Sequence, residues 1–63
     1  MFNQYPDVMT VPQVAEALHI GRGAAYKLVN AKTIGSVRIG KKTRVPKTCL
    51  IEYVKSARYN ISL

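Results

Sequence analysis

The sequence is poor in cysteine, in acidic residues and in long apolar runs. One cysteine, Cys49, stands among 63 residues, so no disulfide can form within the chain. Small secreted domains usually carry paired cysteines, and a lone thiol therefore favours a reducing compartment. No apolar run approaches the roughly 18 residues of a membrane span, and the first residues lack the basic and apolar regions of a signal peptide. We therefore expect a soluble, unprocessed protein of the cytoplasm.

Side chains that perform catalysis or bind metals are just as scarce. The chain holds one histidine, His19, and three acids, Asp7, Glu16 and Glu52. A zinc site needs three or four ligands at short spacings. The sequence also has no Ser-His-Asp set, no paired carboxylates and no phosphate-binding glycine loop. These absences predict no metal, no cofactor and no enzymatic activity.

The length leaves room for one domain, which we place across residues 1–63. A chain of this size buries only about 60% of the surface that its unfolded form exposes. Its folded core is therefore expected to be small and to lie within about residues 9–58, with flexible ends.

Basic charge is abundant, and it is concentrated in one part of the chain. Ten Lys and Arg against three acids give a net charge of +7. Residues 1–21 carry two acids and no Lys or Arg, whereas residues 22–63 carry all ten basic side chains and one acid. This asymmetry favours a surface that meets a polyanion, foremost nucleic acid. Binding to an anionic membrane surface and a general gain in solubility are the alternatives.

The first periodic segment begins after Thr10. Thr10 and Gln13 form a capping-box pattern, and Pro12 suits the first turn of a helix because its missing N–H has no intrahelical partner there. Apolar residues follow at i, i+3, i+4 and i+7, and the pattern stops near His19. One stripe of an amphipathic helix is therefore expected to carry Val11, Val14, Ala15 and Leu18.

A second helix is predicted directly after Gly21. Its apolar side has the spacing i, i+3, i+4 at Ala25, Leu28 and Val29. The opposite side combines basic, aromatic and very small residues at Arg22, Gly23, Tyr26 and Lys27. Two short helices joined by a turn of about three residues that contains glycine are typical of a helix-turn-helix. An ordinary helical hairpin with solvated charges is the alternative.

After the second helix the apolar period changes to the alternation of a strand. A turn at residues 40–43, which begins with Gly40, would connect two strands, so residues 36–45 predict a β-hairpin with a basic tip. We expect Val37, Ile39 and Val45 on its apolar side, and Arg38 and Arg44 on its basic side.

A third helix is predicted after Pro46, where apolar residues return to helical spacing. The expected fold class is α+β: a small winged helix-turn-helix with three helices and a two-stranded β-hairpin wing. Its predicted core includes Val14, Leu18, Leu28, Ile39, Leu50 and Val54.

This order of elements, together with four segments of sequence, resembles the excisionase-type helix-turn-helix DNA-binding family, which is related to the winged domains of the mercury-resistance class of regulators. The segments are TVPQVAEAL, GRGAAYKLV, VRIGKKTRVP and CLIEYV. The resemblance implies a second helix in the major groove and a wing along the backbone or in the adjacent minor groove. Relatives commonly carry serine at Gly21, a polar or basic residue at Gly23 and glycine at Lys32, so the chain departs from them there.

The resemblance implies DNA contacts at seven residues of the second helix and the wing, namely Arg22, Tyr26, Lys27, Arg38, Lys41, Lys42 and Arg44. Gly23 and Ala24 join this candidate site because their small size would let the helix backbone approach a duplex closely. Arg22 is the candidate base reader, since a guanidinium can donate two parallel hydrogen bonds to guanine. Tyr26 and Lys27 are candidates to hold phosphates, with a packing role as the alternative for Tyr26. The wing cations are expected to act through charge.

The resemblance implies an excisionase, a recombination directionality factor that binds double-stranded DNA of a mobile element and assists a cognate integrase. The residues alone indicate DNA binding only. A small transcriptional regulator at a promoter is the first alternative. An RNA-binding protein is a weaker one, because readers of single-stranded RNA usually present aromatic platforms on a sheet. The sequence has no long coiled-coil helix, so we expect a monomer in solution that binds adjacent sites cooperatively.

Overall fold

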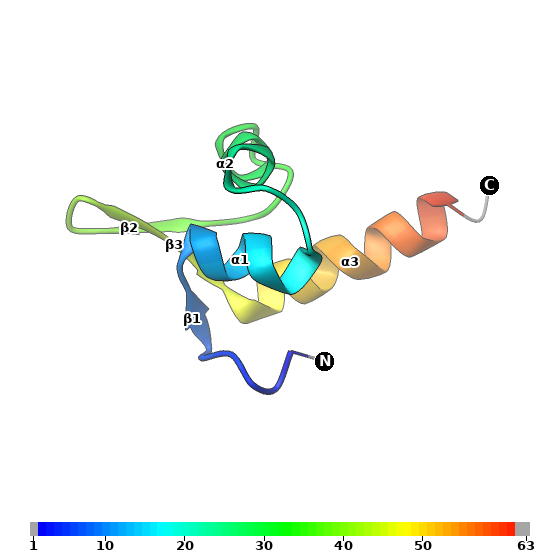
Figure 1. The fold of residues 1–63 in the computed structure, drawn as a ribbon, viewed down its shortest axis with the longest axis horizontal. Coiled ribbons are helices and arrows are strands. Elements are labelled where there is room, and N and C mark those ends of the chain that lie inside the picture. Colours follow the sequence, from blue (N-terminus) through cyan, green and yellow to red (C-terminus); the bar gives the residue numbers. More distant parts are fainter. Residues whose placement is uncertain (1, 62–63) are drawn as a thin grey trace.

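The computed structural model describes the backbone of residues 2–61 and the side chains of residues 2–56. Its elements, in chain order, are β1 (Val8–Met9), α1 (Val11–Leu18), α2 (Arg22–Asn30), β2 (Val37–Ile39), β3 (Lys42–Pro46) and α3 (Lys47–Ile61). The β2–β3 hairpin, here called the wing, and helix α3 extend to opposite sides of α1 (Figure 1). The predicted winged helix-turn-helix is confirmed, with a third strand that the sequence analysis did not foresee.

The start of α1 forms as the sequence predicts. The backbone N–H of Gln13 donates to Thr10 Oγ1 at 3.2 Å, and the backbone N–H of Thr10 donates to Gln13 Oε1 at 2.9 Å. Two donors without intrahelical partners are thereby satisfied. This arrangement fixes the point at which the chain leaves β1 and enters α1.

Helices α1 and α2 end in the same way, with one residue in the left-handed conformation. After α1, His19 has φ 58°, and after α2, Lys32 has φ 61°. In the second case the N–H of Lys32 donates to Val29 O at 3.1 Å, and the N–H of Thr33 donates to Leu28 O at 3.0 Å. This bonding pattern is the Schellman motif, in which glycine is the usual left-handed residue. At Lys32 a side chain with a Cβ therefore occupies a position that favours glycine.

Replacing Lys32 by glycine is expected to stabilise the fold. The left-handed conformation costs an L-residue about 1–2 kcal/mol, and the greater freedom of an unfolded glycine offsets part of that gain. We expect Lys32→Gly to raise the free energy of unfolding by about 1 kcal/mol and the Tm by roughly 4–8 °C. Thermal unfolding followed by circular dichroism measures both. Lys32→Ala removes the same charge but keeps the Cβ, so an equal gain in that variant would contradict the backbone explanation.

The sheet is antiparallel with strand order β1-β3-β2, so β3 lies between two edge strands. Ile39 pairs with Lys42, which leaves Gly40 and Lys41 as a two-residue turn. Gly40 has φ +63°, the backbone conformation that glycine adopts at the first central position of a tight hairpin turn. The prediction of a four-residue turn over 40–43 is therefore wrong, because Lys42 and Thr43 already belong to β3.

The register of the hairpin also corrects the predicted faces of the wing. Val37 pairs with Arg44, and Ile39 pairs with Lys42. Residues that pair directly lie on the same face of a sheet. Val37 and Ile39 therefore share the face of Arg44 and Lys42 and are 45% and 58% exposed. Val45 points to the opposite face and is buried.

The core lies where β1, α1, α2, β3, α3 and the loop before β2 meet. Its buried residues are Met9, Val11, Val14, Ala15, Ala25, Val29, Ile34, Val45 and Leu50. The prediction is confirmed for Val14 and Leu50 and is wrong for Ile39; Leu18, Leu28 and Val54 are half-buried. The hairpin projects beyond the helices, so a side chain near its tip has no layer of protein to pack against (Figure 1).

The segment before β1 is fastened to the start of α3. The backbone N–H of Lys47 donates to Asp7 O at 2.7 Å, and its Nζ donates to Tyr5 O at 3.0 Å. The Tyr5 hydroxyl in turn donates to Glu16 Oε1 at 2.8 Å. This hydrogen bond to a carboxylate favours the protonated phenol and raises the pKa of Tyr5. These bonds hold β1 in place beside β3.

Candidate nucleic-acid interface

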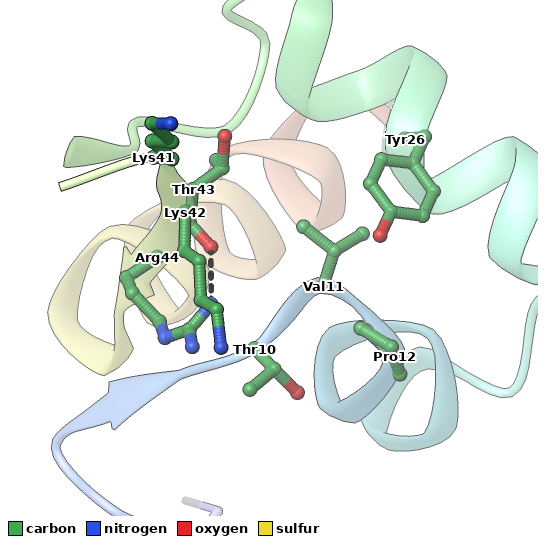
Figure 2. A pocket seen from close by; sticks show the side chains of 8 residues that line it. All are labelled: Thr10, Val11, Pro12, Tyr26, Lys41, Lys42, Thr43 and Arg44. Carbon is green, nitrogen blue, oxygen red and sulfur yellow. Dashed lines mark hydrogen bonds between the residues drawn. The ribbon is translucent and has the colours of Figure 1, made fainter. Parts of the chain in front are cut away.

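A cleft of about 490 Å³ lies between the start of α1, helix α2 and the wing. Figure 2 shows Tyr26 of α2 on one side of it and Lys41, Lys42 and Arg44 of the wing on the other. Its complete lining is Thr10, Val11, Pro12, Tyr26, Lys41, Lys42, Thr43 and Arg44. Four of the candidate DNA-binding residues are thus brought together from two elements distant in sequence.

The cations of this cleft have no carboxylate beside them. No acidic residue lines the cleft, and the ion pair found among the described side chains, Lys47 with Asp7 at 3.6 Å, lies elsewhere. Arg44 Nη1 donates to Thr43 O at 3.0 Å, which holds the guanidinium along its own strand. Like charges gathered without counter-charges repel one another and destabilise a compact state, but they attract a polyanion. The cleft is therefore suited to phosphate groups.

Helix α2 turns its polar side to solvent, as the sequence predicts. Ala25 and Val29 are buried against α1, whereas Arg22, Gly23, Ala24, Tyr26 and Lys27 are exposed. Tyr26 is 46% exposed, so a large part of this residue remains accessible to a partner. Arg22 and Lys27 lie outside the cleft, on the free surface of the same helix.

Gly23 has no packing reason to be glycine. A Cβ built at this position meets no atom within 4 Å, and the residue lies in the first turn of α2, where glycine costs up to about 1 kcal/mol relative to alanine. Gly21, the N-cap of α2, makes no side-chain hydrogen bond to the first turn. The amino-terminal end of α2 is consequently bare backbone and small side chains, with Arg22 as its one long side chain.

A second hollow of about 330 Å³ lies between the carboxyl-terminal end of α2 and the wing. It contains Arg38, which pairs with Thr43 and therefore lies on the opposite face of the wing from Arg44. The expectation that Arg38 and Arg44 share one basic side is wrong. Lys32 also lines this hollow. Sequence reasoning left Lys32 out of the site, although its charge directly after the second helix was a usable signal.

Metal binding and membrane insertion find no support among the described residues. Among them, no three His, Cys, Asp or Glu side chains gather to hold a metal ion. Within the same part of the chain, no helix has the length and apolar character needed to cross a membrane.

The fold and this surface define a class of protein, the winged helix-turn-helix DNA-binding module. A family model described as helix-turn-helix domain matches residues 8–58. The chain belongs to this family, and its curated relatives place it with the excisionase type.

Two such relatives carry excisionase names. A Saccharopolyspora erythraea protein named "Probable excisionase" is 41% identical over 46 residues, which cover 73% of this chain and 47% of that protein. A Streptomyces ambofaciens protein named "Excisionase" is 30% identical over 50 residues, which cover 79% of this chain and 81% of that protein. The match thus spans about half of the Saccharopolyspora protein and most of the Streptomyces protein. No solved structure shows significant similarity to the chain.

Proposed function

We propose that this protein is an excisionase: it binds double-stranded DNA at specific sites beside the attachment sequence of a mobile element and assists a cognate integrase in excision. The names of its relatives suggest this role. The structural observation that supports it is the cleft in which Tyr26 of α2 faces the unpaired cations of the wing. A duplex that enters there meets a protruding helix and a cationic hairpin at the same time.

The proposed division of labour follows from the chemistry of the side chains. Arg22 reads guanine in the major groove, because its guanidinium matches the O6 and N7 acceptors. Tyr26 and Lys27 hold phosphates and so set the register of α2 on the duplex. Gly23 and Ala24 let the helix backbone come close to the bases, since both are exposed and a Cβ built at Gly23 meets no atom within 4 Å.

The wing supplies the general grip on the backbone. Lys41, Lys42 and Arg44 neutralise phosphates from the cleft, and Arg38 does so from the other face of the hairpin. The strands carry no aromatic residue on which unpaired bases would stack, which favours duplex DNA over single-stranded RNA. The protein acts by binding rather than by catalysis, as a monomer that assembles on adjacent sites.

Replacing Arg22 by alanine tests the base-reading role. If Arg22 pairs with guanine, Arg22→Ala weakens binding to the specific site by about 1–3 kcal/mol and binding to random duplexes much less. Arg22→Lys is the matched control, because it keeps the charge and loses the planar guanidinium, so it should bind random duplexes as wild type does and keep only part of the preference for the specific site. Fluorescence anisotropy with both duplexes measures the difference. Equal losses on the two duplexes would make Arg22 a phosphate contact instead.

The role in recombination is tested with purified integrase and paired attachment-site substrates. Wild type should raise excision and leave integration unaided or inhibited, and Arg22→Ala should do so only at higher protein concentrations. A protein that binds its site specifically, leaves excision unchanged and shifts transcription from a nearby promoter would be a transcriptional regulator. That result would replace the proposed function.

A further inference from the structure

The face of the wing that carries the cleft cations also carries two exposed apolar side chains. Ile39 is 58% exposed and Val37 is 45% exposed, and they pair across the hairpin with Lys42 and Arg44. Paired side chains on one face lie about 4.5–5.5 Å apart at Cβ. The four residues therefore form a small block, with two aliphatic side chains on β2 and two cations on β3.

The two aliphatic side chains of this block lie outside the core, and Val37 also borders the hollow that contains Arg38. Val37 and Ile39 are absent both from the buried core and from the partly buried residues packed against it. Strand β2 is an edge of the sheet, so an aliphatic pair there is open to unwanted association, and an edge strand usually carries polar residues instead. The exposure of these two side chains is explained if a binding partner of the protein covers them.

The neighbours of the pair restrict what can cover it. A purely apolar partner would bury Lys42 and Arg44 without counter-charges, which is costly. The partner must therefore present anionic groups and, a few ångströms away, C–H surface. The minor groove of duplex DNA does so, because its walls are deoxyribose C–H groups and its rims are phosphates. Apolar side chains inserted into the minor groove are an established means of binding and bending DNA.

We propose that Ile39, supported by Val37, is an apolar contact of the wing with the deoxyribose walls of the minor groove, between phosphates held by Lys42 and Arg44. The inference rests on the proposed DNA-binding function and extends it. It assigns to the wing a component of affinity that salt does not screen. Charge alone supplies the salt-dependent component.

The test compares Ile39→Ala with wild type on a duplex that wild type selects from a randomised library. Ile39→Ala should weaken binding about fivefold to tenfold, because the removed aliphatic carbons no longer leave water on binding. The slope of log K against log salt should not change, since no phosphate contact is lost. The Tm should also stay near that of wild type, because Ile39 is 58% exposed.

The matched control is Val8→Ala. Val8 is 46% exposed on β1, at the opposite edge of the sheet from β2. This variant should bind as wild type does, with the same salt slope. A loss equal to that of Ile39→Ala would mean that exposed apolar surface affects binding nonspecifically, and it would overturn the inference.

Hydroxyl-radical cleavage of the DNA gives a second readout, because the radical attacks deoxyribose C–H groups that line the minor groove. Wild type should protect a short stretch beside the α2 site, and Ile39→Ala should lose that protection alone. Unchanged affinity and protection in Ile39→Ala would overturn the inference and leave the DNA-binding proposal intact, and reduced self-association in that variant would then assign the patch to protein contacts. Failure of wild type to bind any duplex would overturn the proposed function and this inference together.

Discussion

Replacing Ile34 by alanine is expected to lower the free energy of unfolding by about 2–5 kcal/mol, the usual range for truncating a buried isoleucine. Ile34 is 0% exposed and is one of the largest fully buried side chains of the core. A chain of 63 residues has a total stability of about 3–9 kcal/mol at ordinary values per residue. The truncation therefore removes a large part of it, and urea unfolding followed by circular dichroism should show a much lower midpoint.

The matched control is the same substitution at Ile39. This residue is 58% exposed on the wing, and Ile39→Ala should change stability by no more than about 0.5 kcal/mol. The two variants remove identical atoms, so their difference reports chiefly the burial of Ile34 in the core and the exposure of Ile39 on β2. Equal destabilisation by both would contradict the register of the hairpin, since it would mean that Ile39 packs into the core.

Replacing Lys41 and Lys42 together by alanine is expected to weaken binding to every duplex, whatever its sequence. If each lysine neutralises one phosphate, the slope of log K against log salt falls by about 1.8, which corresponds to roughly 50-fold weaker binding near 0.1 M salt. Anisotropy titrations at several salt concentrations give both quantities. The specific and the random duplex should lose affinity to a similar degree, because phosphate contacts carry no sequence information.

Lys55→Glu is the control for net charge. It alters the charge by two units, as the double variant does, but at an exposed position on α3, which leads away from the wing (Figure 1). Its effect on binding should be small at physiological salt, where charges separated by more than about 8 Å are largely screened. If Lys55→Glu matched the double variant, the wing would have no special place in the interface.

The helices could be predicted from the sequence because their signals are local. Thr10 and Gln13 bond to each other within one turn, and the stripe through Val14 depends only on the period of a helix. The exposed side of α2, with Arg22 and Tyr26, followed from the same period. Such patterns need no knowledge of the remaining chain.

The wing was harder to predict because its faces depend on partners distant in sequence. Alternation shows that Val37 and Ile39 share a face, but only the pairing with β3 determines that this face is the outer one. The second partner of β3 is β1, two residues long, which is too short to leave a pattern. The sequence accordingly predicted the hairpin and its cations but assigned Ile39 to the core, where the structure leaves it 58% exposed.

Ile34 illustrates a different limit. It lies in the loop between α2 and β2, where no periodic neighbour marks it as buried. Its position follows from the left-handed turn at Lys32, whose bonds to the end of α2 bring the chain back over the core. The candidate site was affected less, because exposed cations and small residues are recognisable by type. The separation of Arg38 from Arg44 nevertheless required the register.

Preference for duplex DNA over single-stranded RNA is measured by comparing two nucleic acids of equal length. Wild-type protein is titrated into a labelled DNA duplex and into single-stranded RNA over a series of salt concentrations, with anisotropy as the readout. The protein should bind the duplex clearly more tightly, with log K falling linearly as log salt rises, as release of counterions from the DNA requires. Equal or tighter binding to single-stranded RNA, or duplex affinity that does not depend on salt, would contradict the proposed binding of duplex DNA.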